Sequence, residues 1–223
     1  MKGWIIPKGG ADFVCPMENV LDAYQREYNP KEPLINLDES PKQLIGEKRK
    51  SYTDKQGILH QDYEYERKGV QDIYMIVEPK AGKREVLLKD NHNAKSYAEV
   101  ILHIAENMYP NADKITIIED NLAAHKLSAL YEIISPERAR NIIKRIEIIR
   151  TPKHGSWLNI AELELSILTR QGLDKRIDTK EKLKEQVEEW YQVRNQKISK
   201  VNWTFKTKDA RIKLKRLYPT FNS

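Results

Sequence analysis

Residues 114–121 read Lys-Ile-Thr-Ile-Ile-Glu-Asp-Asn, a short apolar run that leads directly into two acids and an amide. Such a run, rich in β-branched residues, is typical of a strand. The patterns on either side of it predict a helix over 94–108, helical stretches near 127–134 and from Ser135, and a second strand over 145–149. Two strands joined by helical crossovers predict a parallel arrangement in one sheet.

Three further strands are predicted upstream, where turn residues separate short apolar or alternating runs. The first run covers 34–37 (Leu-Ile-Asn-Leu) and ends at Asp38. Residues 42–60 read as a loop, because they are polar and basic and lack periodicity. An antiparallel pair follows, with strands over 63–77 and 85–88 on either side of a glycine turn.

Two helices complete the predicted order, one over 158–171 and a long charged one over 178–194. Three consecutive strands followed by alternating helices and strands predict an α/β fold with a mixed five-stranded sheet flanked by helices. The helical crossovers would place the first, fourth and fifth strands near one another.

The composition is that of an ordinary soluble globular protein, with 39% hydrophobic and 32% charged residues in a chain of 223. The chain has no run of about 18 uncharged apolar residues, which excludes a membrane span. The apolar stretch near the N-terminus is too short for a signal peptide. Cys15 is the single cysteine, so an internal disulfide framework is excluded. We therefore expect a cytoplasmic protein.

Basic residues gather near the C-terminus. The net charge of the chain is +6, whereas residues 194–216 alone hold nine lysines and arginines and one acid, a local charge of +8. The aromatic residues Trp203, Phe205 and Tyr218 lie within or beside this segment. Such a segment suits a polyanion, because lysine and arginine displace counterions along a phosphate backbone. The alternative is a solvated basic face on a packed helix.

Two aspartates stand at the ends of predicted strands, Asp38 after the first strand and Asp120 after the fourth. Ligands of open α/β sheets gather outside the carboxyl ends of the strands. Together with an acid from a facing helix, the two aspartates could form an all-oxygen cage for Mg²⁺ or Mn²⁺. Two such ions about 4 Å apart would clamp the attacking and leaving oxygens of a phosphoryl displacement. The alternative is that both acids are solvated loop residues.

Three segments, in the same order along the chain as in a known family, resemble the segments of that family. They are Asp38 within Leu-Asp-Glu-Ser, the block Glu-Asp-Asn-Leu-Ala-Ala-His over 119–125, and the block Thr-Pro-Lys-His-Gly-Ser-Trp-Leu-Asn-Ile-Ala-Glu over 151–162. They resemble the signature segments of DDE-superfamily transposases, above all those of the mariner-like branch of bacterial insertion-sequence transposases. The likeness extends to Trp4…Pro7, to residues 63–67 and to residues 208–211. It implies an RNase H-like fold and two-metal DNA cleavage and strand joining.

When the catalytic positions of the family are matched to this sequence, the resemblance implies that Asp38, Asp120 and Glu162 are the catalytic acids that bind the two Mg²⁺ or Mn²⁺ ions. Glu164 competes for the third position. Residues two apart on a helix point roughly 200° away from each other, so only one of the two glutamates can face the metals. The family spacing Leu-Asn-x-x-Glu, which starts here at Leu158, selects Glu162.

Neighbouring polar residues receive supporting roles or none. Asn121 matches a signature position and would orient Asp120 or a metal-bound water. His125 would contact a phosphate or cap its own loop, and the second reading is favoured; Asn159 also matches the family pattern. Glu39 and Glu119 adjoin the aspartates, and because adjacent side chains of a strand turn to opposite faces, we expect both to be solvent-exposed.

The positions expected to contact DNA are basic. They are Lys153 and His154, just before the third acid, and the tail residues Arg211, Lys213, Lys215 and Arg216. Exposed loop charge explains the first two equally well.

Two departures from the family pattern bear on domain organisation. The second and third acids are 42 residues apart, longer than is usual in the branch, and an additional helix near Pro136 accommodates the extra length. Only 37 residues precede Asp38, too few for the helix-turn-helix modules that full transposases of this type carry there. The predicted division is a lead-in segment over 1–33, a catalytic core over 34–172 and a basic helical extension over 173–223.

The leading hypothesis is a metal-dependent nuclease and strand transferase that acts on double-stranded DNA of the nucleoid. The resemblance further implies a homodimer and, if the reading frame is split, a separate helix-turn-helix chain. The alternative is a catalytically silent DNA-binding remnant or partner subunit of a split transposase, and a third option is a stand-alone nuclease of the same fold. Nucleotide-cofactor loops, a zinc-ligand spacing and a nucleophile elbow are missing from the sequence.

Overall fold

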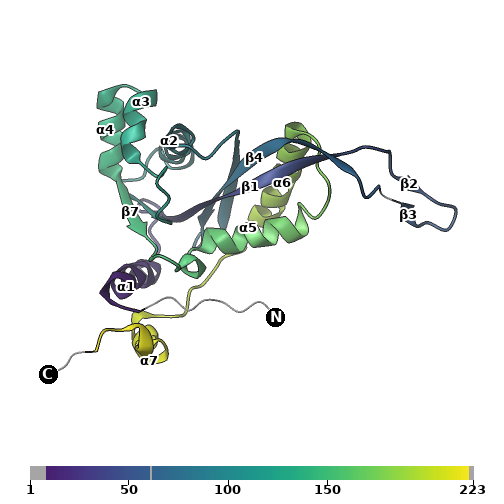
Figure 1. The fold of residues 1–223 in the computed structure, drawn as a ribbon. Coiled ribbons are helices and arrows are strands. Elements are labelled where there is room, and N and C mark those ends of the chain that lie inside the picture. The colour runs from purple at the N-terminus through teal and green to yellow at the C-terminus, as the bar shows by residue number, and fades with distance from the viewer. Residues whose placement is uncertain (1–8, 61, 221–223) are drawn as a thin grey trace.

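Five strands form one mixed sheet in the order β5-β4-β1-β6-β7 (Figure 1). The strands are β1 (Leu34–Glu47), β4 (Tyr65–Glu78), β5 (Lys83–Lys89), β6 (Ile115–Glu119) and β7 (Ile146–Arg150). β4 pairs antiparallel with β1 and with β5, whereas β1, β6 and β7 run parallel. The computed structural model describes residues 9–60 and 62–220. It confirms the predicted mixed sheet and the glycine turn, at Gly82, whose φ of +71° favours glycine.

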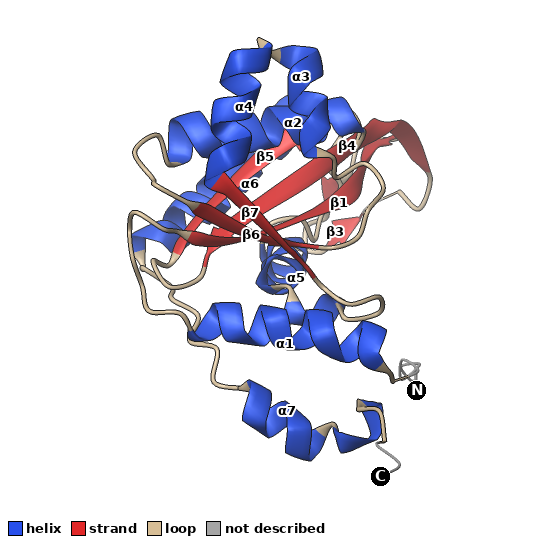
Figure 2. Ribbon diagram, turned by 90° about the vertical axis from the view of Figure 1, so that its left-hand side faces the viewer, coloured by secondary structure: helices blue, strands red, loops and turns tan. Residues whose placement is uncertain are grey.

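Helices cover both faces of the sheet (Figure 2). One face carries α1 (Ala11–Gln25), α5 (Ile160–Gln171) and α6 (Lys180–Gln196), and the other carries α2 (Ala94–His103), α3 (Leu130–Ile133) and α4 (Pro136–Arg145). The predicted helix over 94–108 is present, but its last five residues widen into a π-helical turn. α4 begins as predicted, because the side chain of Ser135 accepts a hydrogen bond from the backbone N–H of Arg138.

Alternation along the strands divides the hydrophobic core in two. In β1, Ile35 and Leu37 pack under α2, whereas Leu34 packs on the opposite face, on the side of α1 and α5. The same alternation turns Asp38 toward the α5 side and Glu39 toward the α2 side. Two acids that are adjacent in the sequence, Asp38 and Glu39, therefore lie on opposite faces of the sheet.

β1 and β4 continue beyond the sheet as a two-stranded arm (Figure 1). β1 pairs with β6 only over 34–36, but its ladder with β4 continues to Glu47. The tip of the arm is formed by the short strands β2 (Tyr52–Thr53) and β3 (Leu59–His60). The prediction that the first strand ends at Asp38 and that 42–60 is a loop was therefore wrong. Most residues of 42–60 are exposed or half-buried and carry no hydrophobic period that would mark a strand, although Leu44 packs into the core on the α5 side.

Helix α1, which the sequence analysis did not assign, occupies part of the predicted lead-in segment. Met17, Val20, Leu21 and Tyr24 recur at three- and four-residue steps, and all four are buried in the core on the α5 side of the sheet. The side chains of α1 are therefore part of the same core as the sheet. The predicted domain boundaries themselves stay a prediction, and the Trp4…Pro7 match lies outside the described residues.

The basic tail is docked on the body of the protein. Its helix α7 (Thr207–Lys213) lies beside α1 (Figure 2), where Nε and Nη2 of Arg211 each donate a 2.9 Å hydrogen bond to the Glu18 carboxylate. The ring of Trp203 stacks on Tyr24 with 4.8 Å between ring centroids. Arg211 thus has a structural partner, as the packed-helix alternative predicts.

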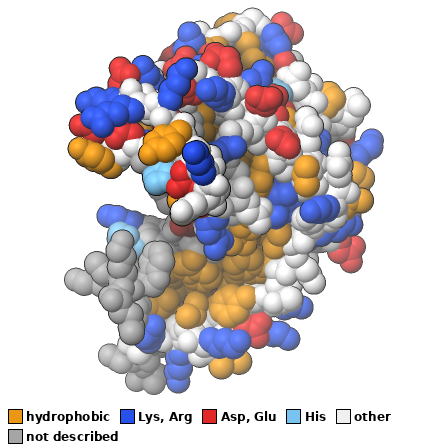
Figure 3. Space-filling model, turned by 90° about the vertical axis from the view of Figure 1, so that its right-hand side faces the viewer, with side chains coloured by type: hydrophobic (Ala, Val, Ile, Leu, Met, Phe, Trp, Pro, Cys, Tyr) orange, Lys and Arg blue, Asp and Glu red, His pale blue; other side chains and the backbone are white. Residues whose placement is uncertain are grey.

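Charged side chains of both signs are spread over the surface. Figure 3 shows lysines, arginines and acids interspersed on the upper part of one face, and hydrophobic side chains gathered in a hollow below them. Among the described residues, no helix is long and apolar enough to cross a membrane.

Candidate active site

The three acids selected from the sequence line one cavity of about 390 Å³. Asp38 comes from β1, Asp120 follows β6, and Glu162 lies in the first turn of α5. The parallel pairing of β1 with β6 brings the two aspartates to the same end of the sheet. Helix α5 packs across this end and supplies the third acid.

Asn159 fixes the start of α5 against β1. Its Oδ1 accepts a 3.1 Å hydrogen bond from the backbone N–H of Ala161, which caps the helix. Its Nδ2 donates a 2.9 Å hydrogen bond to the carbonyl of Leu37, the residue before Asp38. The side chain is buried, so one residue holds the helix that carries Glu162 next to the strand that carries Asp38.

The structure separates Glu162 from Glu164. Glu164 is buried on the other side of α5, where Oε1 lies 2.8 Å from Nη2 of Arg84 and 2.8 Å from Nη2 of Arg194. Burial alone would raise the pKa of Glu164, but the hydrogen bonds from both arginines lower it. Glu162 faces the cavity, and its Oε2 is buried without a hydrogen-bond partner among the described residues.

A second group of polar side chains lies behind the aspartates, on the α2 side of the sheet. Glu119 is fully buried, and its Oε2 accepts a 2.8 Å hydrogen bond from the hydroxyl of Tyr97. The side chain of Glu39 is only 10% exposed. The expectation that both glutamates are solvent-exposed was wrong. Their side chains do turn to the opposite face, but α2 and the loop after β6 cover that face.

His125 bridges this group to the cavity. Nε2 lies 3.2 Å from Oε2 of Glu39, and Nδ1 lies 3.2 Å from Oδ1 of Asp120. The ring stacks on Tyr97 with 4.7 Å between centroids and is fully buried. Both ring nitrogens lie within ion-pair distance of carboxylates, although only Nε2 has hydrogen-bond geometry, and this environment favours the charged imidazolium. Burial would lower the pKa of His125, but Asp120, Glu39 and Glu119 raise it to about 10.

The two aspartates differ in acidity. Burial raises the pKa of Asp38 to about 7, and the charges of Glu39, Asp120 and Glu162 add to this, although the N–H of Glu39 donates a 2.9 Å hydrogen bond to it. The contact with His125 lowers the pKa of Asp120, whose side chain is 46% exposed. Asp120 is therefore held as a carboxylate, while Asp38 is a carboxyl group that a nearby cation would stabilise in its charged form.

The donor set suits a hard divalent cation. All three acids offer oxygen, which Mg²⁺ and Mn²⁺ prefer, and Glu162 presents a buried oxygen that lacks a partner among the described residues. Within the described residues, however, no three acidic, histidine or cysteine side chains converge as a complete ligand set. The acids share a cavity and fit the cations by chemistry, with solvent or substrate oxygens needed to complete the coordination.

A neighbouring cavity of about 660 Å³ contains the basic residues predicted before the third acid. Lys153 and His154 line it, and it shares Asp120 with the acidic cavity. Asn121 also lines it and donates a 2.6 Å hydrogen bond from Nδ2 to the carbonyl of Thr151. Asn121 therefore joins the loop after β6 to the loop after β7, and its amide is not directed at the Asp120 carboxylate.

The predicted tail residues do not line the acidic cavity. Arg211 is paired with Glu18, and the Nζ of Lys213 lies 5.8 Å from the centre of the Phe205 ring. Lys215 and Arg216 are exposed in the turn after α7.

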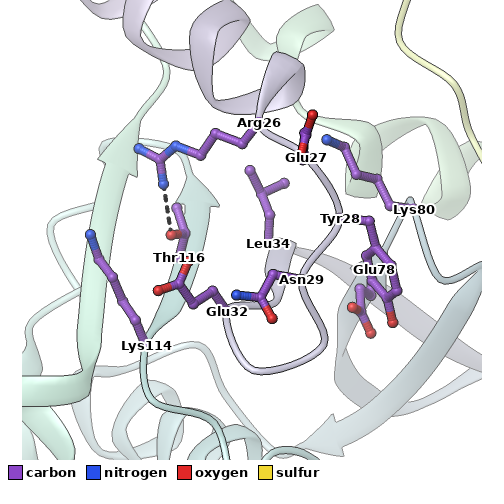
Figure 4. A pocket seen from close by; sticks show the side chains of 10 residues that line it. All are labelled: Arg26, Glu27, Tyr28, Asn29, Glu32, Leu34, Glu78, Lys80, Lys114 and Thr116. Carbon is purple, nitrogen blue, oxygen red and sulfur yellow. Dashed lines mark hydrogen bonds between the residues drawn. The ribbon is translucent and has the colours of Figure 1, made fainter.

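A cavity of about 250 Å³ lies at the opposite end of the parallel strands, beside Leu34 and Thr116 (Figure 4). Its charges are partly neutralised. Arg26 donates a hydrogen bond to Thr116 and pairs with Glu147, and the carboxylate of Glu78 accepts one from Tyr109. It holds none of the predicted site residues.

Four residues near the acids had no predicted role. They are Glu39, Glu119, Tyr97 and Arg150. Arg150 could have been noticed as a cation at the end of the last parallel strand, the position where ligands of such sheets bind. Nothing in the local sequence indicates that Tyr97 lies near the acids, because its spacing is that of an ordinary core residue of its helix.

Comparison with known proteins agrees with this geometry. A family model described as DDE superfamily endonuclease matches residues 33–184. The solved structure of the Mos1 mariner paired end complex with Mn is similar with a TM-score of 0.57 and 16% identity, over 89% of this chain and 60% of that chain. The Mos1 strand transfer complex and the paired end complex with Mg give TM-scores of 0.54 and 0.52, each at 16% identity over 89% of this chain, and over 62% and 63% of those chains.

At 16% identity, these structures establish the fold, which is the RNase H-like fold of Mos1 transposase. This chain spans about 60–63% of the length of the Mos1 chains named here. No curated protein matches the chain.

Proposed function

The chain belongs to the DDE superfamily of endonucleases, and from this premise we propose that it is a transposase catalytic domain that cleaves DNA and joins DNA strands. The observation that supports this most directly is the placement of Asp38, Asp120 and Glu162 around one cavity. A chain without turnover would have no structural need for three carboxylates that repel one another.

We propose that Asp38, Asp120 and Glu162 bind two Mg²⁺ or Mn²⁺ ions. When bound, such ions supply Lewis acidity and neutralise the charge that develops on a transferring phosphoryl group. The remaining residues position the acids. The His125 ring holds Asp120, and Asn159 holds the start of α5 beside β1. Support for the choice of metals comes from the all-oxygen donor set.

Double-stranded DNA is the proposed substrate, and Lys153 and His154 are proposed to contact its phosphates beside the acids, with Lys213, Lys215 and Arg216 as outer contacts. Arg211 is the weakest of these assignments, because Glu18 already neutralises it. By analogy with the paired end complexes of Mos1, we also propose that two copies of this chain act together. A separate helix-turn-helix chain would supply recognition of the element ends. The cytoplasm, with the nucleoid DNA, is the proposed place of action.

The test is nicking and strand joining on duplex DNA at low salt with Mg²⁺ or Mn²⁺, comparing the wild type with Asp120→Asn. The variant keeps the size of the side chain and removes its charge. Glu181→Gln, at the exposed start of α6, is the matched control. We expect metal-dependent nicking by the wild type and the control, and its loss in Asp120→Asn.

Full activity of Asp120→Asn would refute the proposed site. DNA binding without nicking by the wild type, even after a helix-turn-helix chain is added, would support a catalytically silent remnant instead. Nicking without strand joining would support a stand-alone nuclease of the same fold.

A further inference from the structure

Three cavities lie in a row along the carboxyl end of the parallel strands. The acidic cavity shares Asp120 and Ser156 with the 660 Å³ cavity. That second cavity shares Pro16 and Arg150 with a third, of about 570 Å³. The first and third have no lining residue in common. The three therefore form a chain, which we name the strand groove, with the catalytic acids at one end.

Helix α1 forms one wall of the strand groove. Asp12 and Pro16 line the second cavity, and Pro16 and Asn19 line the third. The opposite wall is formed by the loops that follow β6 and β7. Figure 2 shows α1 beneath the sheet, on the same side as α5.

The charge of the groove changes sign along its length. Its first cavity is lined by the acids Asp38, Asp120 and Glu162. The second adds Arg150, Lys153 and His154 to the acids Asp12 and Asp120. The third is lined by Arg150, Lys126 and the buried His125, without any acid. Metal ions suit the first part, whereas the third part complements a chain of phosphates.

Arg150 is placed to act on the groove. Its Nη2 donates a 2.9 Å hydrogen bond to the carbonyl of His125 and lies 3.6 Å from Oε1 of Glu119. These contacts orient a guanidinium that has five N–H donors, and 42% of the side chain is exposed. Lys126, on the facing loop, is exposed as well.

The size of the cavities selects a single strand. Each has a volume within the range of about 300–1,000 Å³ found for small-ligand sites. A complete duplex, whose major groove alone is about 12 Å wide, does not fit inside such a space. Beyond the phosphates that Lys153 and His154 contact, only one strand can therefore continue along the groove toward Arg150 and Lys126, with its bases turned outward.

We propose that the strand groove binds the backbone of one DNA strand on one side of the phosphodiester that is cleaved, with Arg150 and Lys126 as its phosphate contacts. This proposal rests on the proposed function, because it takes the acids as the point of cleavage. It adds the path of the strand, two residues that contact it, and a role for α1.

The test measures binding of a fluorescein-labelled ten-nucleotide oligothymidine by anisotropy, in EDTA, as a function of salt. Arg150→Gln and Lys126→Gln are compared with Lys144→Ala, an exposed lysine of α4 outside the groove. Lys126→Gln is the safer variant for folding, because this side chain is exposed, and melting curves check all three. A blunt duplex of the same length serves as a second probe.

We expect each groove variant to weaken oligothymidine binding by about tenfold, the effect of one charge-assisted contact. The slope of log K against log salt should fall by about 0.7 for each lost contact. Lys144→Ala should bind as the wild type does, and duplex binding should change little.

Unchanged affinity and slope in both folded groove variants would overturn the proposal, as would an equal loss for the duplex. Because binding is measured without metal, the result is independent of cleavage. If the groove variants bind oligothymidine more weakly but the wild type does not nick DNA, the proposed activity is rejected and the groove is not. If the wild type nicks DNA but the groove variants bind oligothymidine as it does, the groove is rejected and the activity is not.

Discussion

The side-chain amide of Asn159 donates a 2.9 Å hydrogen bond to the carbonyl of Leu37, and this contact ties α5, which carries Glu162, to the central strand β1. Asp38 follows Leu37 directly, and Glu162 lies three residues beyond Asn159. The spacing between two of the three acids thus depends on one buried amide that also caps α5.

Replacement of Asn159 by alanine should therefore reduce both stability and cleavage. Loss of the cap costs about 1 kcal/mol, and the buried carbonyl left without a donor adds about 1–3 kcal/mol. Ser135→Ala, which removes the cap of α4, should lose about 1 kcal/mol and keep full cleavage. Urea denaturation and nicking assays would check both variants. Equal cleavage by both would show that the Asn159 contact does not position the acids.

Replacement of His125 by phenylalanine should destabilise the protein strongly. The new ring can still stack on Tyr97, but Glu39 loses the imidazolium, and the buried Glu119 keeps the Arg150 guanidinium at 3.6 Å. Removal of one partner from a buried ion pair costs about 3–5 kcal/mol. Adding Glu39→Gln to His125→Phe should recover part of this loss, because it removes one uncompensated charge. A double variant no more stable than His125→Phe, by urea denaturation, would contradict the proposed ion pairing.

Replacement of Asp38 by asparagine should stabilise the metal-free protein while it abolishes cleavage. Three carboxylates facing one cavity repel one another, and removal of such functional strain commonly yields about 0.5–2 kcal/mol. Melting curves in EDTA would measure the gain. In Mg²⁺ the difference should shrink, because the cation stabilises the wild type. A metal-free Asp38→Asn protein that melts below the wild type would argue against repulsion at this site.

The edge strand β7 contains a pH-dependent contact. Glu147 accepts from Arg26 at 2.7 Å and from Thr116 at 2.8 Å, and Lys114 lies 3.1 Å away. The hydrogen bond from Arg26 is the main cause that lowers the pKa of Glu147 to about 2. A carboxyl whose pKa is lower in the folded state stabilises the fold above its unfolded pKa of about 4.5. That stability is lost as the pH falls from about 4.5 toward 2.

Glu147→Gln should accordingly cost about 1 kcal/mol at pH 7, a value reduced for solvent screening of a partly exposed side chain. Urea denaturation at pH 7 and at pH 2.5 would show the difference from wild type closing at the lower pH. Glu188→Gln, which breaks an exposed pair with Lys184 on α6, should cost less than about 0.5 kcal/mol at either pH. A pH-independent cost for Glu147→Gln would rule out the charge as its origin.

Local patterns in the sequence were enough to predict the five strands of the sheet, though not the full length of β1, and the helices α2 to α6. Patterns with a period of two or of 3.6 residues reflect which side of a strand or helix is buried. They can therefore be recognised without knowing which element covers that side. The order and spacing of Asp38, Asp120 and Glu162 came from the resemblance to a family, because the local pattern left Glu162 and Glu164 equivalent. Asp120 directly follows its strand, but Asp38 lies inside β1.

Only the tertiary structure decided which acids face the cavity and which are buried elsewhere. Glu162 and Glu164 are equivalent in the helical pattern until Arg84 and Arg194 bind one of them. Alternation turns Glu119 away from Asp120, but whether that face meets solvent or α2 depends on packing between segments far apart in the chain. The arm of β1 and the wall formed by α1 have the same origin, because burial is a property of the assembled fold and not of the local sequence.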